Sequence, residues 1–186
     1  MVSCIFAMRR RWEYGMVQGG TFVKKCEWCN YTDEKWLLLK NEYWTVYLAD
    51  EQDYIGRCIL VLNRHCGSLS QLEMQEWIAL KKLIDKLEKC FKVVLGAEVC
   101  NWSCLMNSFY KCEEPNPHLH IHVRPRYKNT LNINTNTYCD AEYGHHYKLK
   151  KEIQLVEADR VSMFELMKEK LNVGEEEYEN PMCMGT

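Results

Sequence analysis

The clearest alternation of polar and apolar positions in the chain runs through residues 116–127. His118, His120 and His122 occupy every second position, and the residues between them are leucine, isoleucine and valine. Alternate side chains of a β-strand point to opposite faces, so the three imidazoles share one face at intervals of roughly 7 Å while the aliphatic side chains pack into a core. A helix would scatter the same histidines around its circumference. The pattern therefore predicts a core strand that carries a histidine face.

Shorter patterns predict the strands around this one. Residues 43–49 alternate as a strand, and residues 58–62 form a continuous apolar run that is typical of a strand buried on both faces. Residues 93–99 and 102–107 are two further predicted strands, with a polar loop from the second of them to the histidine strand.

Two capping boxes predict where helices begin. The first, at residues 70–73, is followed by apolar residues at helical spacing as far as Phe91, which indicates a helix with one face packed on the sheet. The second, at residues 162–165, predicts a short helix over residues 162–172 that ends near Gly174. Many strands with few helices favour an α+β domain, built on an antiparallel meander sheet of about five strands with one long packed helix.

These elements divide the chain into three parts. Residues 1–20 lack a clean periodicity and form an N-terminal extension, and residues 21–130 form the α+β domain. Residues 131–186 form a C-terminal extension with the short helix and an acidic tail. With 186 residues, of which 47% are hydrophobic, the chain can bury the core of one domain with extensions.

The net charge and the cysteines indicate which binding partners and which cell compartment to expect. The formal net charge of −2 gives no reason to expect a nucleic acid polymer as partner. No apolar run approaches the roughly 20 residues that cross a bilayer, and the N-terminal apolar stretch precedes its arginines, unlike a signal peptide, so we expect no membrane association. Eleven cysteines are an odd number, and free thiols in a reducing cytoplasm are the expected state.

Cys26 and Cys29 differ from the other cysteines in their spacing, which is that of a zinc knuckle. In such a site two thiolates share a tetrahedral ion, and two further ligands are needed. The alternative is a pair of ordinary thiols. A thioredoxin-type redox role is disfavoured, because the pair does not lie between a strand and a helix start.

Together with its surroundings, the histidine pattern resembles the histidine triad superfamily of nucleotide hydrolases and transferases, over roughly residues 24–127. The resemblance rests on the triad, on the apolar strand and basic residue that lead to His65 in residues 56–65, on the cysteine pair and on residues 125–127. It implies a histidine-triad-like fold and a homodimer that joins two five-stranded sheets. It also implies hydrolysis or transfer at the α-phosphate of a nucleotide or dinucleoside polyphosphate.

The resemblance implies roles for the histidines. His120 is expected to be the nucleophile that forms a covalent nucleotidyl-histidine, with the backbone carbonyl of His118 fixing its tautomer and His122 contacting the phosphoryl oxygens. Imidazole, with an ordinary pKa of about 6.5, is mostly neutral at pH 7, as a nucleophile must be. Family members with the cysteine pair complete a structural zinc site with the counterparts of His65 and His118, and here Cys66 is an alternative ligand.

Four further residues are expected to contact the substrate. Asn107 precedes His120 by thirteen residues, as a phosphate-contacting amide does in the family, and Asp50 lies in the turn expected to reach the ribose. Arg124 ends the triad strand and is a candidate phosphate contact. Arg57 stands where the family keeps a fourth histidine; an arginine can clamp a phosphate but cannot donate a proton at neutral pH.

A second departure from the family lies just before the triad. Residues 114–117 replace the small polar stretch that normally helps to protonate the leaving group. With the missing histidine, this departure keeps two other functions open. One is a nucleotide-binding module without turnover, and the other is a metal-dependent hydrolase in which the histidine face itself holds a catalytic ion.

Overall fold

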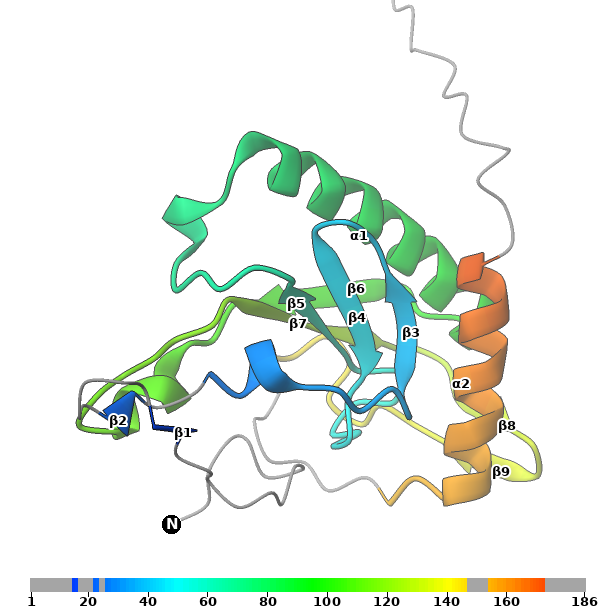
Figure 1. Cartoon of the computed structure of the whole chain (residues 1–186). Helices are drawn as coiled ribbons and strands as arrows, with labels where there is room; N and C mark the ends of the chain where they lie inside the picture. The colour runs from blue at the N-terminus through cyan, green and yellow to red at the C-terminus, as the bar shows by residue number, and fades with distance from the viewer. Residues whose placement is uncertain (1–14, 17–21, 24–25, 147–153, 173–186) are drawn as a thin grey trace, which may run out of the picture.

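The centre of the computed structural model is a five-stranded antiparallel sheet with strand order β3-β4-β5-β7-β6 (Figure 1). The structure describes residues 15–16, 22–23, 26–146 and 154–172. The strands of the sheet are β3 (Leu37–Lys40), β4 (Trp44–Leu48), β5 (Cys58–Leu62), β6 (Val99–Ser103) and β7 (His120–Arg126). An α+β fold with five antiparallel strands, one long helix and a short C-terminal helix is confirmed, and β7 takes its place between β5 and β6.

The long helix α1 (Met74–Leu95) packs along one face of the sheet (Figure 1). Its buried side chains share a core with Leu119, Ile121 and Val123, the aliphatic residues between and beside the histidines. Because successive residues of a strand face opposite ways, the histidines point to the face away from α1. The buried residues on α1 are Glu76, Leu80, Leu83, Leu87, Cys90, Phe91 and Leu95.

The start of α1 differs from the prediction. The helix begins at Met74, after a capping box in which Glu73 and Glu76 each accept a hydrogen bond from the other's backbone. Residues 69–71 instead form a separate 3-10 helix, η2 (Leu69–Gln71). Arg64 binds the Glu76 carboxylate at 2.6 Å and ties this first turn to the end of β5. The predicted capping box at residues 70–73 was therefore wrong by one turn, because a tertiary ion pair selected the later cap.

The end of α1 also differs, and this shifts the following strand. Residues 93–95 continue the helix where a strand was predicted, because Leu95 is buried in the core. Gly96, with a φ of 66°, adopts the left-handed conformation that closes a helix. β6 then ends at Ser103, so residues 104–107 lie outside it and Asn107 begins a 3-10 helix, η3 (Asn107–Lys111).

The C-terminal helix α2 (Glu157–Asn172) packs along β3 and beside α1 (Figure 1). It begins earlier than the predicted Ser162, because the buried Asp159 accepts hydrogen bonds from Tyr138, at 2.5 Å, and from Asn134 and Asn136. Those residues belong to the hairpin of β8 (Leu131–Ile133) and β9 (Asn136–Tyr138). The side chains of α2 that join the main core are Met163, Phe164, Met167 and Leu171.

Several predictions concern residues outside the described part of the chain. They include the helix end near Gly174, the acidic tail and most of the N-terminal extension, of which only β1 (Gly15–Met16), paired with β2 (Phe22–Val23), is described. The domain boundaries at residues 20 and 130 stay predictions. Neither of the two α-helices that the structure describes is long and apolar enough to cross a lipid bilayer.

Candidate functional site

The histidines lie on the face of the sheet opposite α1, which we call the triad face. His120 is paired with Val61 of β5, and His122 is paired with Ile59 of β5 on one side and Ser103 of β6 on the other. Directly paired residues share a face, so the side chains of Val61, Ile59 and Ser103 surround the two imidazoles. The rings of His120 and His122 are 4.9 Å apart between centroids, and His120 is 6% exposed.

The backbone sets the tautomer of His120. Its Nδ1 lies 2.9 Å from the carbonyl oxygen of His118, and only a protonated Nδ1 can donate to that oxygen. The lone pair of the ring is therefore on Nε2. Burial also lowers the pKa of His120, which favours the neutral ring at pH 7. A neutral imidazole with its lone pair on Nε2 is suited to nucleophilic attack.

Aromatic side chains flank the His120 ring. Trp28, in η1 (Trp28–Asn30), lies 6.0 Å from it and Phe109, in η3, lies 5.8 Å from it, measured between ring centroids. Trp28 also contacts Tyr31 edge-on at 5.7 Å, and Tyr31 contacts Tyr47 of β4 at 5.2 Å. The segment that contains the cysteine pair therefore covers part of the triad face and brings Trp28 against His120.

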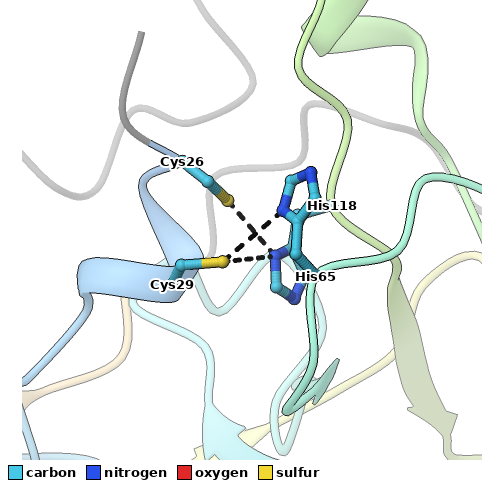
Figure 2. Close-up of side chains that lie close together, drawn as sticks. All are labelled: Cys26, Cys29, His65 and His118. Carbon is cyan, nitrogen blue, oxygen red and sulfur yellow. Dashed lines mark hydrogen bonds between the residues drawn. The ribbon is translucent and has the colours of Figure 1, made fainter. Parts of the chain in front are cut away.

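Cys26, Cys29, His65 and His118 converge at the His118 end of the triad face (Figure 2). Their four ligand atoms lie within 4.8 Å of one another. Cys26 Sγ is 3.2 Å from His118 Nδ1, and Cys29 Sγ is 3.5 Å from Nδ1 of both histidines. Zinc bonds of about 2.0–2.3 Å in a tetrahedron separate the ligand atoms by about 3.3–3.8 Å. The cluster thus fits a structural zinc ion with four protein ligands.

A hydrogen bond behind the cluster supports this assignment. Nε2 of His118 lies 2.7 Å from the carbonyl oxygen of Leu62, so Nε2 carries the proton and the lone pair on Nδ1 points to the cysteines. The structure therefore brings together the four residues expected as ligands. The alternative, Cys66, instead contacts the carbonyl oxygen of Ser68 at 3.3 Å and stands outside the cluster. Bound zinc would link the cysteine segment to the triad strand.

At the other end of the triad face, two buried arginines share one carboxylate. Asp53 Oδ1 lies 3.1 Å from Arg57 Nη1, and Asp53 Oδ2 lies 3.0 Å from Arg124 Nε. The side chains of Arg57, Asp53 and Arg124 are 9%, 6% and 3% exposed. Glu51 adds a longer contact to Arg57, at 3.7 Å, from a side chain that is 53% exposed. We call Asp53, Arg57 and Arg124 the arginine cluster; its buried charges sum to one positive charge.

Arg57 also reaches the triad. Its Nη2 lies 3.4 Å from Nδ1 of His122, and because a guanidinium can only donate, Nδ1 accepts and the proton of His122 is on Nε2. Burial, reinforced by the charges of His120, Arg57 and Arg124, lowers the pKa of His122 to about 2. His122 is thus a neutral hydrogen-bond donor. The Nε of Arg57 is buried and has no hydrogen-bond partner among the described residues.

Two predicted contacts remain, Asp50 and Asn107. Asp50 pairs with Arg160 of α2 at 3.2 Å, and Arg160 in turn stacks on Trp36 at 4.2 Å. Asn107 is exposed at the start of η3. The residue of β6 that faces His122 is Ser103, and its Oγ is buried and without a hydrogen-bond partner in the part of the chain that the structure describes.

Sequence reasoning did not single out four residues that surround the triad. Asp53 precedes Arg57 by four residues and pairs with it across a turn, where no helical spacing indicates the pair in advance. Ser103 could be found only from the strand register. Trp28 stands between the two cysteines, so a metal site at that pair already implied that it lies near the triad strand. Phe109 had no signal, since the sequence predicts a polar loop where the structure has η3.

No protein-family model matches the sequence, and no curated protein does. Solved structures do match in fold. A histidine triad protein from Bradyrhizobium japonicum has a TM-score of 0.55 at 14% identity, covering 73% of this chain and 89% of that one. A histidine triad nucleotide-binding protein from Sulfolobus tokodaii has a TM-score of 0.50 at 12% identity, covering 73% and 83%.

A third match is a uridylyltransferase, with a TM-score of 0.52 at 16% identity, covering 75% of this chain and 42% of that chain. At such low sequence identities, these matches establish similarity of fold only. In this chain the same fold carries His120 and His122 on β7, between β5 and β6, and His118 just before that strand, at a site that fits zinc. The chain therefore has the histidine triad fold, with the triad itself at the start of β7.

Proposed function

We propose that this protein is a nucleotide phosphohydrolase or nucleotidyltransferase that acts through a covalent nucleotidyl-His120 intermediate. The observation that carries the proposal is the 2.9 Å hydrogen bond from His120 Nδ1 to the carbonyl oxygen of His118, because it leaves the Nε2 lone pair for attack. The fold, shared with a histidine triad nucleotide-binding protein and a uridylyltransferase, supports nucleotide chemistry.

In the proposed reaction, Nε2 of His120 forms a bond to the α-phosphorus as the bond to the leaving group breaks. Water, or an acceptor in a transferase, then attacks the same phosphorus and releases the imidazole. The Nε2–H of His122 and the hydroxyl of Ser103 would donate hydrogen bonds to the phosphoryl oxygens as negative charge builds up on them. The sequence suggested Asn107 as a contact to the phosphate. We assign that contact to Ser103 instead, because Ser103 is paired with His122 across the strands.

Two contacts expected from the sequence stay part of the proposal. Asp50, held by Arg160 at 3.2 Å, is proposed to bind the ribose. Arg57 and Arg124 are proposed to bind phosphate, and the contact of Arg57 with His122 at 3.4 Å supports this role. The substrate class is therefore a nucleotide in which a phosphoryl group lies between nucleoside and leaving group.

Geometry disfavours a hydrolase in which the histidine face holds a catalytic metal. The one group of metal-ligating side chains found among the described residues uses His118 alone of the triad. Nδ1 of His122 faces Arg57, a cation, and Nδ1 of His120 is bonded to a carbonyl oxygen. Chelation should therefore reduce activity only as far as it unfolds the protein.

The test is turnover by the wild type and by His120→Ala. The wild type should release AMP from diadenosine triphosphate, and an alkaline quench during turnover should yield protein heavier by one adenylyl group. His120→Ala should still bind the nucleotide but lose turnover and the adduct. His146→Ala, which removes an exposed histidine, is the control. Full activity in His120→Ala would rule out the mechanism, and binding by the wild type without AMP or adduct would indicate a nucleotide-binding module.

We also propose a homodimer formed through the edge of β6. Of the two edge strands, β3 is covered by α2, whereas Val99 on β6 is 47% exposed. An uncovered edge strand can pair with a second copy of itself, which would join two five-stranded sheets. Light scattering in solution should give twice the mass of the 22.2 kDa chain. A monomer that retains activity would contradict the dimer.

The free thiols of the described cysteines support a cytoplasmic location.

A further inference from the structure

The loop between β4 and β5 joins the proposed ribose contact to the triad. Ala49 and Asp50 begin this loop directly after β4, and Arg57 ends it with a guanidinium that lies 3.4 Å from Nδ1 of His122. The backbone N–H of Ala49 donates to the carbonyl oxygen of Arg57 at 2.9 Å, so the two ends of the loop are held together. The position of Asp50 relative to the triad therefore depends on what holds this loop.

Gln52 fixes the backbone of the loop from inside. Its side chain is buried, and Nε2 donates to the carbonyl oxygens of Ala49, at 2.7 Å, and of Arg57, at 3.0 Å. Its Oε1 accepts from the backbone N–H of Gly56 at 2.7 Å. These three bonds hold the backbone, and none of them reaches the side chain of Asp50.

Arg160 of α2 holds the Asp50 side chain from outside the loop. Its Nη2 lies 2.9 Å from the carbonyl oxygen of Ala49 and 3.2 Å from Oδ1 of Asp50. The side chains of Arg160 and Asp50 are 13% and 28% exposed, so solvent screens this ion pair only in part. Hydrogen bonds between charged groups are stronger than neutral ones, so one guanidinium fixes both the carboxylate and the backbone beside it.

Arg160 is in turn held by the packing of α2. Its guanidinium lies 4.2 Å from the centroid of the Trp36 ring, and Phe164, also of α2, contacts the same ring edge-on at 5.3 Å. The preceding residue, Asp159, is buried and accepts hydrogen bonds from the hairpin of β8 and β9. The C-terminal helix therefore presents a fixed guanidinium to the loop that carries Asp50.

We infer that Arg160 is a positioning residue that orients the Asp50 carboxylate for the ribose hydroxyls, so that α2 sets the preference for ribose. The inference rests on the proposed function and names a residue that determines its specificity. Among the described residues Arg160 alone binds this carboxylate, through Oδ1, so Oδ2 is left to accept from a hydroxyl. A nucleotide that lacks the hydroxyls leaves this charge-assisted bond unmade.

The experiment measures the preference for ribose with the full chain. The substrates are diadenosine triphosphate and its analogue in which both nucleosides are 2′,3′-dideoxyadenosine, and kcat and KM are determined for each. The wild type should use the ribose substrate at least about 10-fold better in kcat/KM, the size of a hydrogen bond to a charged group. Asp50→Ala should remove most of this preference.

Arg160→Gln tests the positioning role. It should lower kcat/KM for diadenosine triphosphate by about 10-fold, mainly through KM, and change that for the dideoxy analogue by less than about 2-fold, because only the ribose contact is lost. In the variant that combines Arg160→Gln with Asp50→Ala, the loss should be no larger than in Asp50→Ala, since both changes act on one contact.

Lys35→Gln is the matched control. Lys35 lies 4.6 Å from the centroid of the same Trp36 ring and pairs with Glu157 of α2 at 3.2 Å, so it shares the packing of Arg160 on this helix. Its replacement should leave the ratio between the two substrates unchanged. A loss of the preference in Lys35→Gln equal to that in Arg160→Gln would contradict a specific role of Arg160.

Each result separates the inference from the proposed function. Equal use of both substrates by the wild type, with AMP released and the adduct formed on His120, would overturn the inference and support the function. An equal loss on both substrates in Arg160→Gln would mean that Arg160 only stabilises the fold, which also overturns it. No AMP and no adduct from either substrate would overturn both. If Arg160→Gln does not fold, Arg160→Met, which keeps an unbranched stem on Trp36, takes its place.

Discussion

The two ends of the triad strand have opposite chemistry. At the His118 end, two thiols and two imidazoles surround a space that fits a zinc cation. At the Arg124 end, two guanidiniums share one carboxylate and keep a positive charge. His120 lies between these ends, with His122 on the arginine side.

The difference lies in how complete each end is. Four protein ligands satisfy a tetrahedral zinc ion, so the zinc end is closed and its role is structural. The arginine cluster contains the buried Nε of Arg57, which has no hydrogen-bond partner among the described residues, so a donor is left there for a bound group. An incomplete buried site next to a nucleophile is the part of the molecule suited to substrate. Three changes test this comparison.

The largest effect is expected at the zinc end. Replacing Cys26 and Cys29 together by serine should abolish zinc binding and lower the free energy of unfolding by about 4 kcal/mol, the value for a ligand present at 1,000 times its dissociation constant. Urea unfolding and metal analysis of the purified protein measure the two quantities. The wild type treated with a chelator should match the variant, since both lack the ion that joins the cysteine segment to β7.

Cys139→Ser is the matched control, because Cys139 is exposed and outside the cluster. It should retain full zinc content and the stability of the wild type. If the double variant still bound one zinc per chain, the ligand set would be wrong. If it lost zinc without loss of stability, the ion would not be structural.

The next largest effect is expected at Asp53. Asp53→Asn removes the carboxylate shared by Arg57 and Arg124 and should lower the free energy of unfolding by about 3 kcal/mol, because two buried cations are left facing each other. Inorganic phosphate should restore part of this loss by supplying an anion. Thermal unfolding with and without phosphate, at constant ionic strength, measures both effects.

Asp140→Asn is the control for the rescue of Asp53→Asn by phosphate. Asp140 is a buried carboxylate bound to Arg126 at 2.5 Å, so its loss is also destabilising, but the site lies apart from His122. Phosphate should rescue Asp53→Asn more than Asp140→Asn. Equal rescue of both variants would mean that the arginine cluster has no special affinity for anions.

The smallest effect is expected at the phosphate contact, for which Ser103 and Asn107 are the two candidates. Ser103→Ala should lower kcat/KM by about 2–13-fold, which corresponds to one hydrogen bond of 0.5–1.5 kcal/mol. Asn107→Ala should have less effect, because Asn107 is exposed in η3 while Ser103 is paired with His122. Steady-state kinetics with diadenosine triphosphate compares the two. A larger loss of kcat/KM for Asn107→Ala would indicate that the phosphate contact is Asn107, assigned from its spacing to His120. It would contradict Ser103, assigned from the strand register.

Local pattern was enough for the strand that carries the chemistry. The two-residue period of a strand places His118, His120 and His122 on one face whatever surrounds them, and Cys26 and Cys29 have metal spacing by themselves. The same reasoning failed at the ends of α1. Helix boundaries depend on partners such as Arg64 for Glu76 and the core for Leu95, which no local window contains.

By itself, then, the sequence determined the α+β class and the histidine face, and it indicated Cys26 and Cys29 as a metal-binding pair; the tertiary structure decided that His65, and not Cys66, joins them with His118. Only the tertiary structure decided that Ser103 faces His122 and that Arg57 and Arg124 share Asp53. The physical reason is register and burial. Which residues meet across neighbouring strands depends on loop lengths and pairing, and whether two arginines repel or bind an anion depends on how far water is excluded from them.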